Sequence, residues 1–226
     1  MISHKYKCIF IHIPKCAGTS IEKALGHFNG HSGRSGQDHR TIRMIEQPWF
    51  NISSIKSLSN IEELFRKIKH KTIYKTNSKN HISVTSSEFK KYFKFSVVRN
   101  PYARVYSWFR NVIRDDFHLK HYGISKDIEF YDYLSRFLVN TYMIRQQVYW
   151  LKNFEGKIKL DYIGKFEEID TVFKYISKSL AIDNIHFPHE KKSEHIDYRD
   201  VYDHKSIDLV TKYYKDDLTF FNYSFD

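Results

Sequence analysis

Two segments of the chain share a pattern of apolar and polar positions. Residues 8–13 form a nearly continuous apolar run that ends at Pro14, which is typical of a strand buried on both faces. After a short loop, apolar residues recur at helical spacing as far as Phe28. Residues 93–98 form a second such strand, and a helical stripe follows Pro101. The pattern therefore predicts two strand, loop, helix units.

The rest of the chain continues this alternation. After a glycine-containing loop at 29–40, it predicts a helix capped by Asn60, a strand at 71–76, a helix from Asp127, a strand at 160–163, a helix at 169–180 and a last helix at 206–214. Such alternation predicts an α/β fold with a mainly parallel central sheet flanked by helices. A length of 226 residues suits one domain over residues 1–226, because a single core can serve up to about 250 residues.

Composition narrows the classes of protein to which the chain can belong. The chain is 41% hydrophobic, which is enough apolar surface to fold, and its net charge of +11 favours anionic partners without choosing among them. Because no apolar run approaches the roughly 18 residues of a membrane span and no signal-peptide pattern is present, we expect a cytoplasmic protein without a membrane span. Cys8 and Cys16 fit neither a disulfide framework nor a zinc site, so we expect reduced thiols.

The loop between the first strand and its helix carries candidate chemistry. A cation, a small-residue turn and two hydroxyls follow the strand directly, in the residues Lys15, Cys16, Ala17, Gly18, Thr19 and Ser20. Backbone N–H groups at such a turn can bind a phosphate, and a lysine adds a point charge. An ordinary turn with a solvated lysine explains the residues equally well.

Two other phosphate chemistries fit this loop poorly. The nucleotide kinase pattern G-x-x-x-x-G-K-[ST] is absent, because the pairs Gly156-Lys157 and Gly164-Lys165 are not followed by Ser or Thr. A cysteine-dependent phosphatase would need an arginine just after Cys16, and residues 16–22 contain none. Cys16 is therefore interpreted as a small loop residue, although a helix N-terminus could lower its pKa.

A family resemblance makes the interpretation specific. The segment 11–20, Ile-His-Ile-Pro-Lys-Cys-Ala-Gly-Thr-Ser, resembles the 5′-phosphosulfate loop of sulfotransferases that use 3′-phosphoadenylyl sulfate, in the branch of bacterial and carbohydrate sulfotransferases. The segment 95–107 resembles the 3′-phosphate motif of that family, in which Arg99 and Ser107 match the phosphate-binding positions. The family's basic loop near the adenine is matched by Lys191, Lys192 and Ser193, for which a solvated charged loop is the alternative.

The resemblance implies a P-loop-NTPase-like sulfotransferase fold, a 3′-phosphoadenylyl sulfate donor, an adenosine 3′,5′-bisphosphate product and a hydroxyl acceptor, by analogy a carbohydrate. Sulfuryl transfer needs stabilisation of the transferring oxygens and of the leaving phosphate, and Lys15 is the candidate for both tasks. Since the leaving group is already a stabilised anion, we expect no metal.

A histidine is the expected general base, because its usual pKa of about 6.5 is close to working pH. His39 lies in the segment 36–41, which resembles the place of a catalytic histidine in related sulfotransferases. His81 is the reserve candidate, whereas His12 is interpreted as a strand residue near the site.

Two other functions stay open from sequence. One is an ATP-dependent kinase of a small molecule, and the other is a non-catalytic binder of nucleic acid or acidic glycan that relies on the positive charge. A sulfotransferase would bind no nucleic acid.

Overall fold

The computed structural model describes residues 1–182 and 197–225. The chain divides into two compact units. The first unit comprises Met1–Val98 and Tyr149–Glu190, and the second comprises Arg99–Val148 and Lys191–Asp226. The boundary at residues 98 and 99 falls directly after a strand, within the segment that resembles the 3′-phosphate motif.

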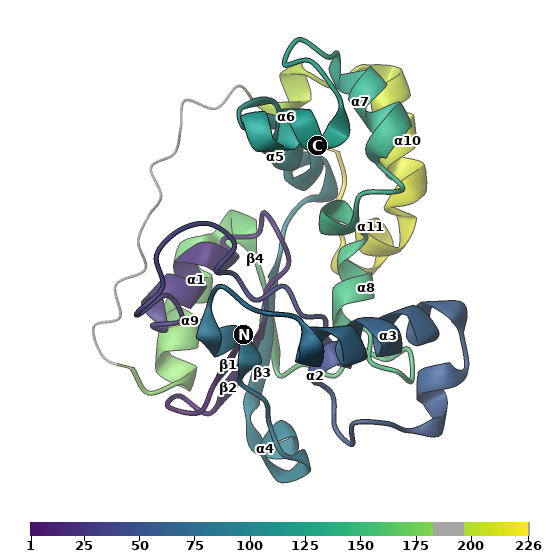
Figure 1. The fold of residues 1–226 in the computed structure, drawn as a ribbon. Helices are drawn as coiled ribbons and strands as arrows, with labels where there is room; N and C mark the ends of the chain where they lie inside the picture. The colour runs from purple at the N-terminus through teal and green to yellow at the C-terminus, as the bar shows by residue number, and fades with distance from the viewer. Residues whose placement is uncertain (183–196, 226) are drawn as a thin grey trace. The chain divides into compact units, whose positions relative to one another are not determined.

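A four-stranded sheet forms the centre of the first unit (Figure 1). Its order is β1 (Ile2–Ser3), β2 (Cys8–Ile11), β3 (Phe93–Val98) and β4 (Tyr162–Lys165). β1 pairs antiparallel with β2, while β2 with β3 and β3 with β4 are parallel. The expected α/β fold with a mainly parallel sheet flanked by helices is confirmed.

Apolar side chains determine the register of the two central strands. Phe10 of β2 lies opposite Phe95 of β3, and their rings stack with centroids 5.0 Å apart. Where β2 ends, the hydroxyl of Ser96 donates a hydrogen bond of 2.7 Å to the carbonyl of Ile11. Because the two strands are parallel, the loop after β2 and the chain leaving β3 start from the same edge of the sheet.

The helices of the first unit are α1 (Gly18–Ala24), α2 (Ile42–Ile45), α3 (Leu58–Thr72), α4 (Ser86–Lys91) and α9 (Ile169–Ser179). Short 3₁₀ helices are η1 (Ile52–Ile55), η2 (Ser78–His81) and η4 (Phe166–Glu168), and α8 (Gln147–Leu151) crosses the boundary of the units. α9 packs closely on β4, since a Cβ on Gly164 would lie 2.5 Å from Cγ2 of Val172.

Two sequence predictions around α3 are wrong. Residues 71–76 form no strand, because α3 continues through the basic residues as far as Thr72. The cap of α3 is Ser57, whose hydroxyl accepts a hydrogen bond of 3.2 Å from the amide of Asn60. Asn60 itself lies in the first turn and is buried, so the apolar residues after it do not mark the start of the helix.

In the second unit, residues 99–148 and 197–225 form helices and loops only. The helices are α5 (Pro101–Ile113), α6 (Asp116–Tyr122), α7 (Phe130–Phe137), α10 (His204–Tyr213) and α11 (Lys215–Phe221), with 3₁₀ helices η3 (Tyr142–Ile144) and η5 (Tyr198–Asp200).

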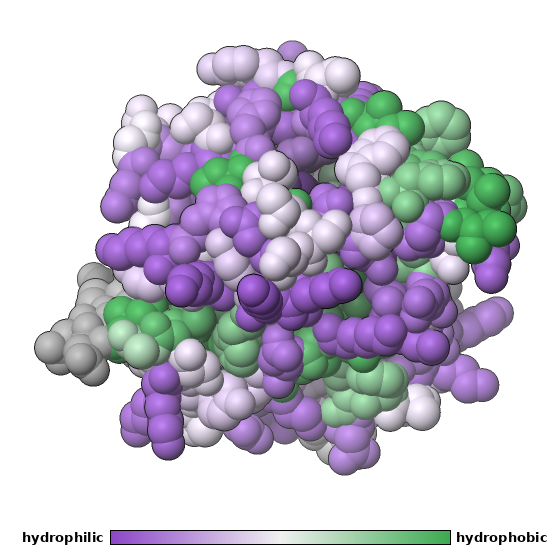
Figure 2. All heavy atoms as spheres, turned by 90° about the horizontal axis from the view of Figure 1, so that it is seen from below, coloured by the Kyte–Doolittle hydropathy of each residue, from purple (hydrophilic) through white to green (hydrophobic). Residues whose placement is uncertain are grey.

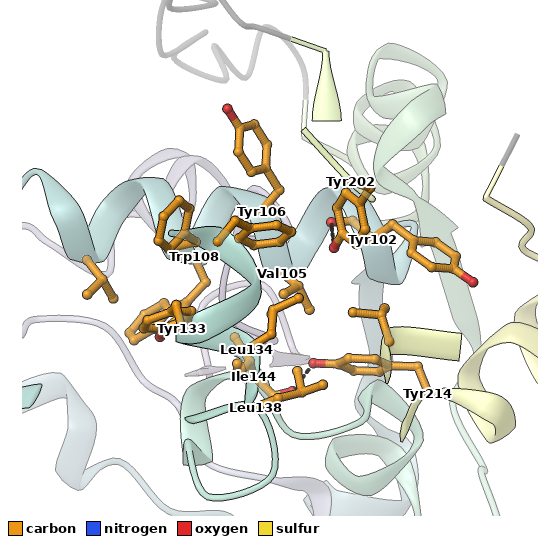
Figure 3. Close-up of a cluster of buried hydrophobic side chains, with 14 residues drawn as sticks. Tyr102, Val105, Tyr106, Trp108, Tyr133, Leu134, Leu138, Ile144, Tyr202 and Tyr214 are labelled. Atoms are coloured by element: carbon orange, nitrogen blue, oxygen red, sulfur yellow. Dashed lines mark hydrogen bonds between the residues drawn. The ribbon is translucent and has the colours of Figure 1, made fainter. Parts of the chain in front are cut away.

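Aromatic side chains fill the core of this unit (Figure 3). The polar ends of these aromatics are paired: Nε1 of Trp108 donates to the hydroxyl of Tyr133 at 3.0 Å, and the hydroxyl of Tyr214 donates to the carbonyl of Ile144. Buried Tyr and Trp need such partners, which specify how the helices pack.

Candidate active site

The loop between β2 and α1 has an unusual backbone. Lys15 has φ 68° and Ala17 has φ 59°, both in the left-handed region, whereas Cys16 between them does not. Residues other than glycine cost about 1–3 kcal/mol each in this region, and such strain concentrates at functional sites. The loop therefore maintains a shape that its residue types do not favour by themselves.

This alternation gives the loop the geometry of an anion cradle. Successive residues of alternating backbone hand turn their N–H groups toward one concave side, a nest that binds anions. The N-cap of α1 is Ala17, whose side chain cannot accept hydrogen bonds from the first turn. Lys15 and Thr19 are partly exposed, while Ser20 is buried. The assignment of this loop to a phosphate site stays a prediction, and its residue types and backbone are compatible with it.

The ring of His12 lies against this loop. A Cβ on Gly18 would stand 2.0 Å from Cδ2 and 2.2 Å from Nε2 of His12, so only glycine fits here. The group that lies against Gly18 is thus the buried imidazole of His12.

Glu22 of α1 holds the other side of the same imidazole. Nδ1 of His12 lies 3.1 Å from Oε1 of Glu22, and both side chains are buried. The amide of Asp38 donates to the same carboxylate oxygen at 3.1 Å. Burial by itself would raise the pKa of Glu22, but the nearby His12 outweighs it and the pKa is lowered. A buried carboxylate thus connects the strand end, α1 and the segment around residue 38.

His39 packs on His12. The two ring centroids are 4.3 Å apart, and Nδ1 of His39 lies 3.3 Å from the carbonyl oxygen of His12. Because a carbonyl only accepts, Nδ1 of His39 carries the proton and Nε2 keeps its lone pair. Burial, together with the charge of His12, lowers the pKa of His39 to about 3. His39 is thus a neutral imidazole with an unprotonated Nε2 at ordinary pH.

Asp38 and Arg40 fix the backbone on both sides of His39. Nη2 of Arg40 forms an ion pair of 2.6 Å with Oδ2 of Asp38, and its Nη1 donates to the carbonyl of Ile82 at 2.9 Å. Burial alone would raise the pKa of Asp38, but Arg40 outweighs it and the pKa is well below its usual value. The residues on both sides of His39 are therefore held in place by an ion pair and hydrogen bonds. His81, the reserve base, lies exposed at the end of η2.

Both cysteines are free thiols. Cys16 is buried in the loop, with its Sγ 3.7 Å from the carbonyl oxygen of Pro14. Burial raises the pKa of Cys8 to about 12, which keeps that thiol protonated and unreactive.

In the second unit, the side chain of Gln147 forms hydrogen bonds with both the amide and the carbonyl of Arg99. The amide of Arg99 donates to Oε1 of Gln147 at 2.8 Å, and Nε2 of Gln147 donates back to the Arg99 carbonyl at 2.8 Å. Gln147 and Val148 in turn donate their amides to the carboxylate of Asp217, at 2.6 and 2.9 Å. Burial raises the pKa of Asp217 against the opposite effect of these amides.

The two arginines of this motif have different surroundings. Arg104 is fully buried and donates to the carbonyls of Arg145 and Met143 at 2.9 and 2.8 Å, which is a structural role. Arg99 is partly exposed, as is Ser107 farther along α5. Asn100 caps α5 by accepting a hydrogen bond of 3.0 Å from the amide of Tyr102. Within the segment 95–107, Arg99 and Ser107 are thus the residues that are not buried.

Sequence reasoning placed His12 near the site, but it missed the contact of His12 with Glu22 and the residues that support the second motif. His12 and Glu22 interrupt apolar stretches, and such buried polar positions were the available signal. Nothing in the sequence connects Gln147 or Asp217 with Arg99. The remaining predicted donor-binding residues, Lys191, Lys192 and Ser193, lie outside the described residues.

Comparison with known proteins identifies the class to which this fold and loop belong. The model of the sulfotransferase family matches residues 1–224. The chain therefore belongs to the sulfotransferase family. Searches of curated proteins and of solved structures give no match.

Neither a metal-binding cluster nor a membrane-spanning helix is found in the described part of the chain. Among residues 1–182 and 197–225, no group of three or more His, Cys, Asp or Glu side chains could hold a metal ion. Within the same residues, no helix has both the length and the apolar character needed to cross a bilayer.

Proposed function

We propose that this protein transfers a sulfuryl group from 3′-phosphoadenylyl sulfate to the hydroxyl of a carbohydrate or another small acceptor. The observation that carries the proposal is the alternating backbone at Lys15, Cys16 and Ala17, directly after a buried strand, in a chain of the sulfotransferase family. An anion cradle at this position is what a 5′-phosphosulfate group requires.

The donor would be bound at both of its charged ends. The loop of Lys15, Gly18 and Thr19 would receive the 5′-phosphosulfate, with Cys16, Ala17 and Ser20 supplying backbone. Arg99 and Ser107 would bind the 3′-phosphate, since a guanidinium fork and a hydroxyl form charge-assisted hydrogen bonds with phosphate oxygens. The loop of Lys191, Lys192 and Ser193 would add charge near the nucleotide.

In the proposed reaction, the acceptor oxygen forms a bond to sulfur while the bond from sulfur to the bridging phosphate oxygen breaks. The bond electrons remain on that oxygen, and adenosine 3′,5′-bisphosphate leaves as an anion. Lys15 would stabilise the charge on the transferring and bridging oxygens. The donor's own good leaving group makes a metal unnecessary in this scheme.

His39 would accept the acceptor proton on Nε2. The proposed role of His39 as a general base is supported by the hydrogen bond from its Nδ1 to the His12 carbonyl, which leaves Nε2 unprotonated. A pKa of about 3 makes it a weaker base than an ordinary histidine, yet one that is neutral over the whole physiological range. His12 and Glu22 would act through position, because they support both the loop and the ring of His39.

The test is transfer of radiolabelled sulfate from 3′-phosphoadenylyl sulfate to a panel of saccharides and phenols, without added magnesium. Formation of a labelled product together with adenosine 3′,5′-bisphosphate is expected. A magnesium-dependent transfer of phosphate from ATP would instead identify a kinase. Tight binding of nucleic acid or acidic glycan without any turnover would identify a binding protein.

A further inference from the structure

Helix α3 has its polar and apolar faces reversed relative to an ordinary surface helix. The buried residues of this helix are Asn60, Glu63 and Lys67, all polar. Leu58 and Phe65, by contrast, are 87% and 66% exposed. A surface helix of a globular protein normally turns its apolar stripe toward the core. α3 therefore needs a separate account of what holds it and of what its outer face does.

The buried face is held by polar contacts within the first unit. Nδ2 of Asn60 donates to the carbonyls of Ser53 and Phe154 at 2.7 and 2.9 Å, and the hydroxyl of Tyr149 donates to Glu63 at 2.5 Å. Nζ of Lys67 donates to the carbonyl of Glu46 at 2.6 Å. These bonds anchor α3 without using its apolar side chains, so the outer stripe is not required for attachment.

The outer face carries apolar residues at helical spacing. Leu58, Ile61, Phe65 and Ile68 recur at intervals of three and four, which places them on one side of the helix. Leu58, Phe65 and Ile68 are exposed, and Ile61 is partly exposed.

Neighbouring segments add more exposed apolar side chains, and η1 packs against α3. We define the α3 patch by its exposed large hydrophobic residues: Phe50, Ile52, Ile55, Leu58, Phe65, Ile68, Ile73 and Tyr74. Figure 2 shows hydrophobic surface atoms gathered at the right of the view, the side on which Figure 1 draws α3. An exposed apolar group of this kind marks an interaction surface.

The charges around the α3 patch are mainly positive. Lys56, Lys69 and Lys71 are exposed, whereas the acidic Glu63 is buried and Glu62 is partly buried. A second copy of the chain would bring the same cationic rim against itself, which is unfavourable. An anionic surface complements both features, since apolar side chains enter the headgroup region while lysines contact phosphates.

We propose that the α3 patch binds peripherally to anionic phospholipid bilayers. α3 would lie along the membrane surface, with Leu58 and Phe65 as its apolar anchors and Lys69 and Lys71 as contacts to lipid phosphate. This binding is separate from sulfuryl transfer, so its test does not depend on the proposed function.

The experiment is co-sedimentation of the whole protein with vesicles of phosphatidylcholine alone or with about a third phosphatidylglycerol. Binding to the anionic vesicles only, weakened by added salt, is expected. Lys69→Gln with Lys71→Gln should weaken binding at least about fivefold, because two charges that attract the anionic surface are removed. Leu58→Gln with Phe65→Gln should weaken it at least about tenfold, because the apolar anchors are removed.

A matched control separates the patch from general hydrophobicity. Phe117 of α6 is 64% exposed, close to the 66% of Phe65, but belongs to the second unit. Phe117→Gln should leave vesicle binding unchanged, and Lys120→Gln with Lys126→Gln controls for the removal of two exposed lysines. Thermal unfolding of each variant, unchanged from the wild type, verifies that the fold is intact.

Three results would overturn the proposal. One is that the wild type does not bind anionic vesicles at low salt. Another is that Leu58→Gln with Phe65→Gln binds them as the wild type does. The third is a wild-type protein that does not bind vesicles and that light scattering shows to be a dimer, converted to a monomer by these substitutions. The occupant of the α3 patch would then be a second copy of the chain.

Discussion

The carbonyl oxygen of His12 accepts a hydrogen bond from Nδ1 of His39, at 3.3 Å. This bond selects the tautomer of His39 and leaves Nε2 as an acceptor. The backbone of one histidine thus determines the chemistry available to the other.

Replacing His39 should reduce turnover without weakening the binding of the donor. We expect His39→Ala to lower kcat by about 10²–10⁴, the usual contribution of a general base, with the Kd for adenosine 3′,5′-bisphosphate nearly unchanged. Initial rates and calorimetry measure the two quantities. His81→Ala is the matched control and should retain wild-type kcat; if it loses activity while His39→Ala does not, the two roles must be exchanged.

The pH–rate profile should lack an inflection from His39 near its ordinary pKa. A histidine with a lowered pKa stays neutral as pH falls until that value is reached, here about 3, so its base form persists from about pH 8 to about pH 5. We therefore expect kcat/KM for the donor to be flat near pH 6.5, where an unperturbed histidine would titrate. An acidic limb near pH 6.5 that His39→Ala abolishes would contradict the shifted pKa.

Gly18→Ala should be destabilising because of His12. The added Cβ would lie 2.0 Å from Cδ2 of the buried ring, and overpacking typically costs about 1–3 kcal/mol in the free energy of unfolding. Urea denaturation of Gly18→Ala, His12→Ala and the double variant forms a cycle. The double variant should be more stable than the sum of the single effects predicts; strict additivity would mean that the two residues do not clash.

Lys15→Ala should lower kcat by more than it weakens the binding of adenosine 3′,5′-bisphosphate, because the role proposed for the lysine is at the transferring group rather than at the 3′-phosphate. Rates at saturating donor and calorimetry with the product separate the two effects. Lys23→Ala, an exposed lysine on α1, is the control for loss of charge alone. Unchanged kcat in Lys15→Ala would remove this lysine from the mechanism.

Arg99 should distinguish nucleotides with a 3′-phosphate. We expect the wild type to bind adenosine 3′,5′-bisphosphate at least about tenfold more tightly than adenosine 5′-monophosphate, a difference of about 1.4 kcal/mol. Arg99→Ala should largely abolish this preference, while Arg110→Ala, a change on α5, should keep it. Equal affinity of the wild-type protein for both nucleotides would contradict the proposed donor.

The sequence predicted the central strands well because local patterns determine them. The apolar runs of β2 and β3 can be buried only inside a sheet, and a small-residue turn must follow β2. The helix α3 was also predicted, but its N-cap is Ser57 rather than Asn60, and its last residues were assigned to a strand.

The supporting residues of the candidate site depend on contacts between distant segments. His39 was selected through a family resemblance, but its hydrogen bond to His12 and its lowered pKa arise from burial that one sequence does not reveal. Glu22 could be noticed as a charge beside an apolar stripe, yet its partner His12 belongs to another element. Secondary-structure propensity reflects residues that are neighbours in the chain, whereas these contacts depend on tertiary packing between distant segments.

The order in which the chain is synthesised determines when the hydrogen bonds around Arg99 can form. Arg99 and Gln147 leave the ribosome well before Asp217. The carboxylate of Asp217 accepts hydrogen bonds from the backbone amides of Gln147 and Val148. Since chains emerge from the N-terminus onward, the arginine motif is synthesised long before its anchoring is complete. A nascent chain that ends before α11 would carry every residue of both motifs and still lack the carboxylate that fixes Gln147.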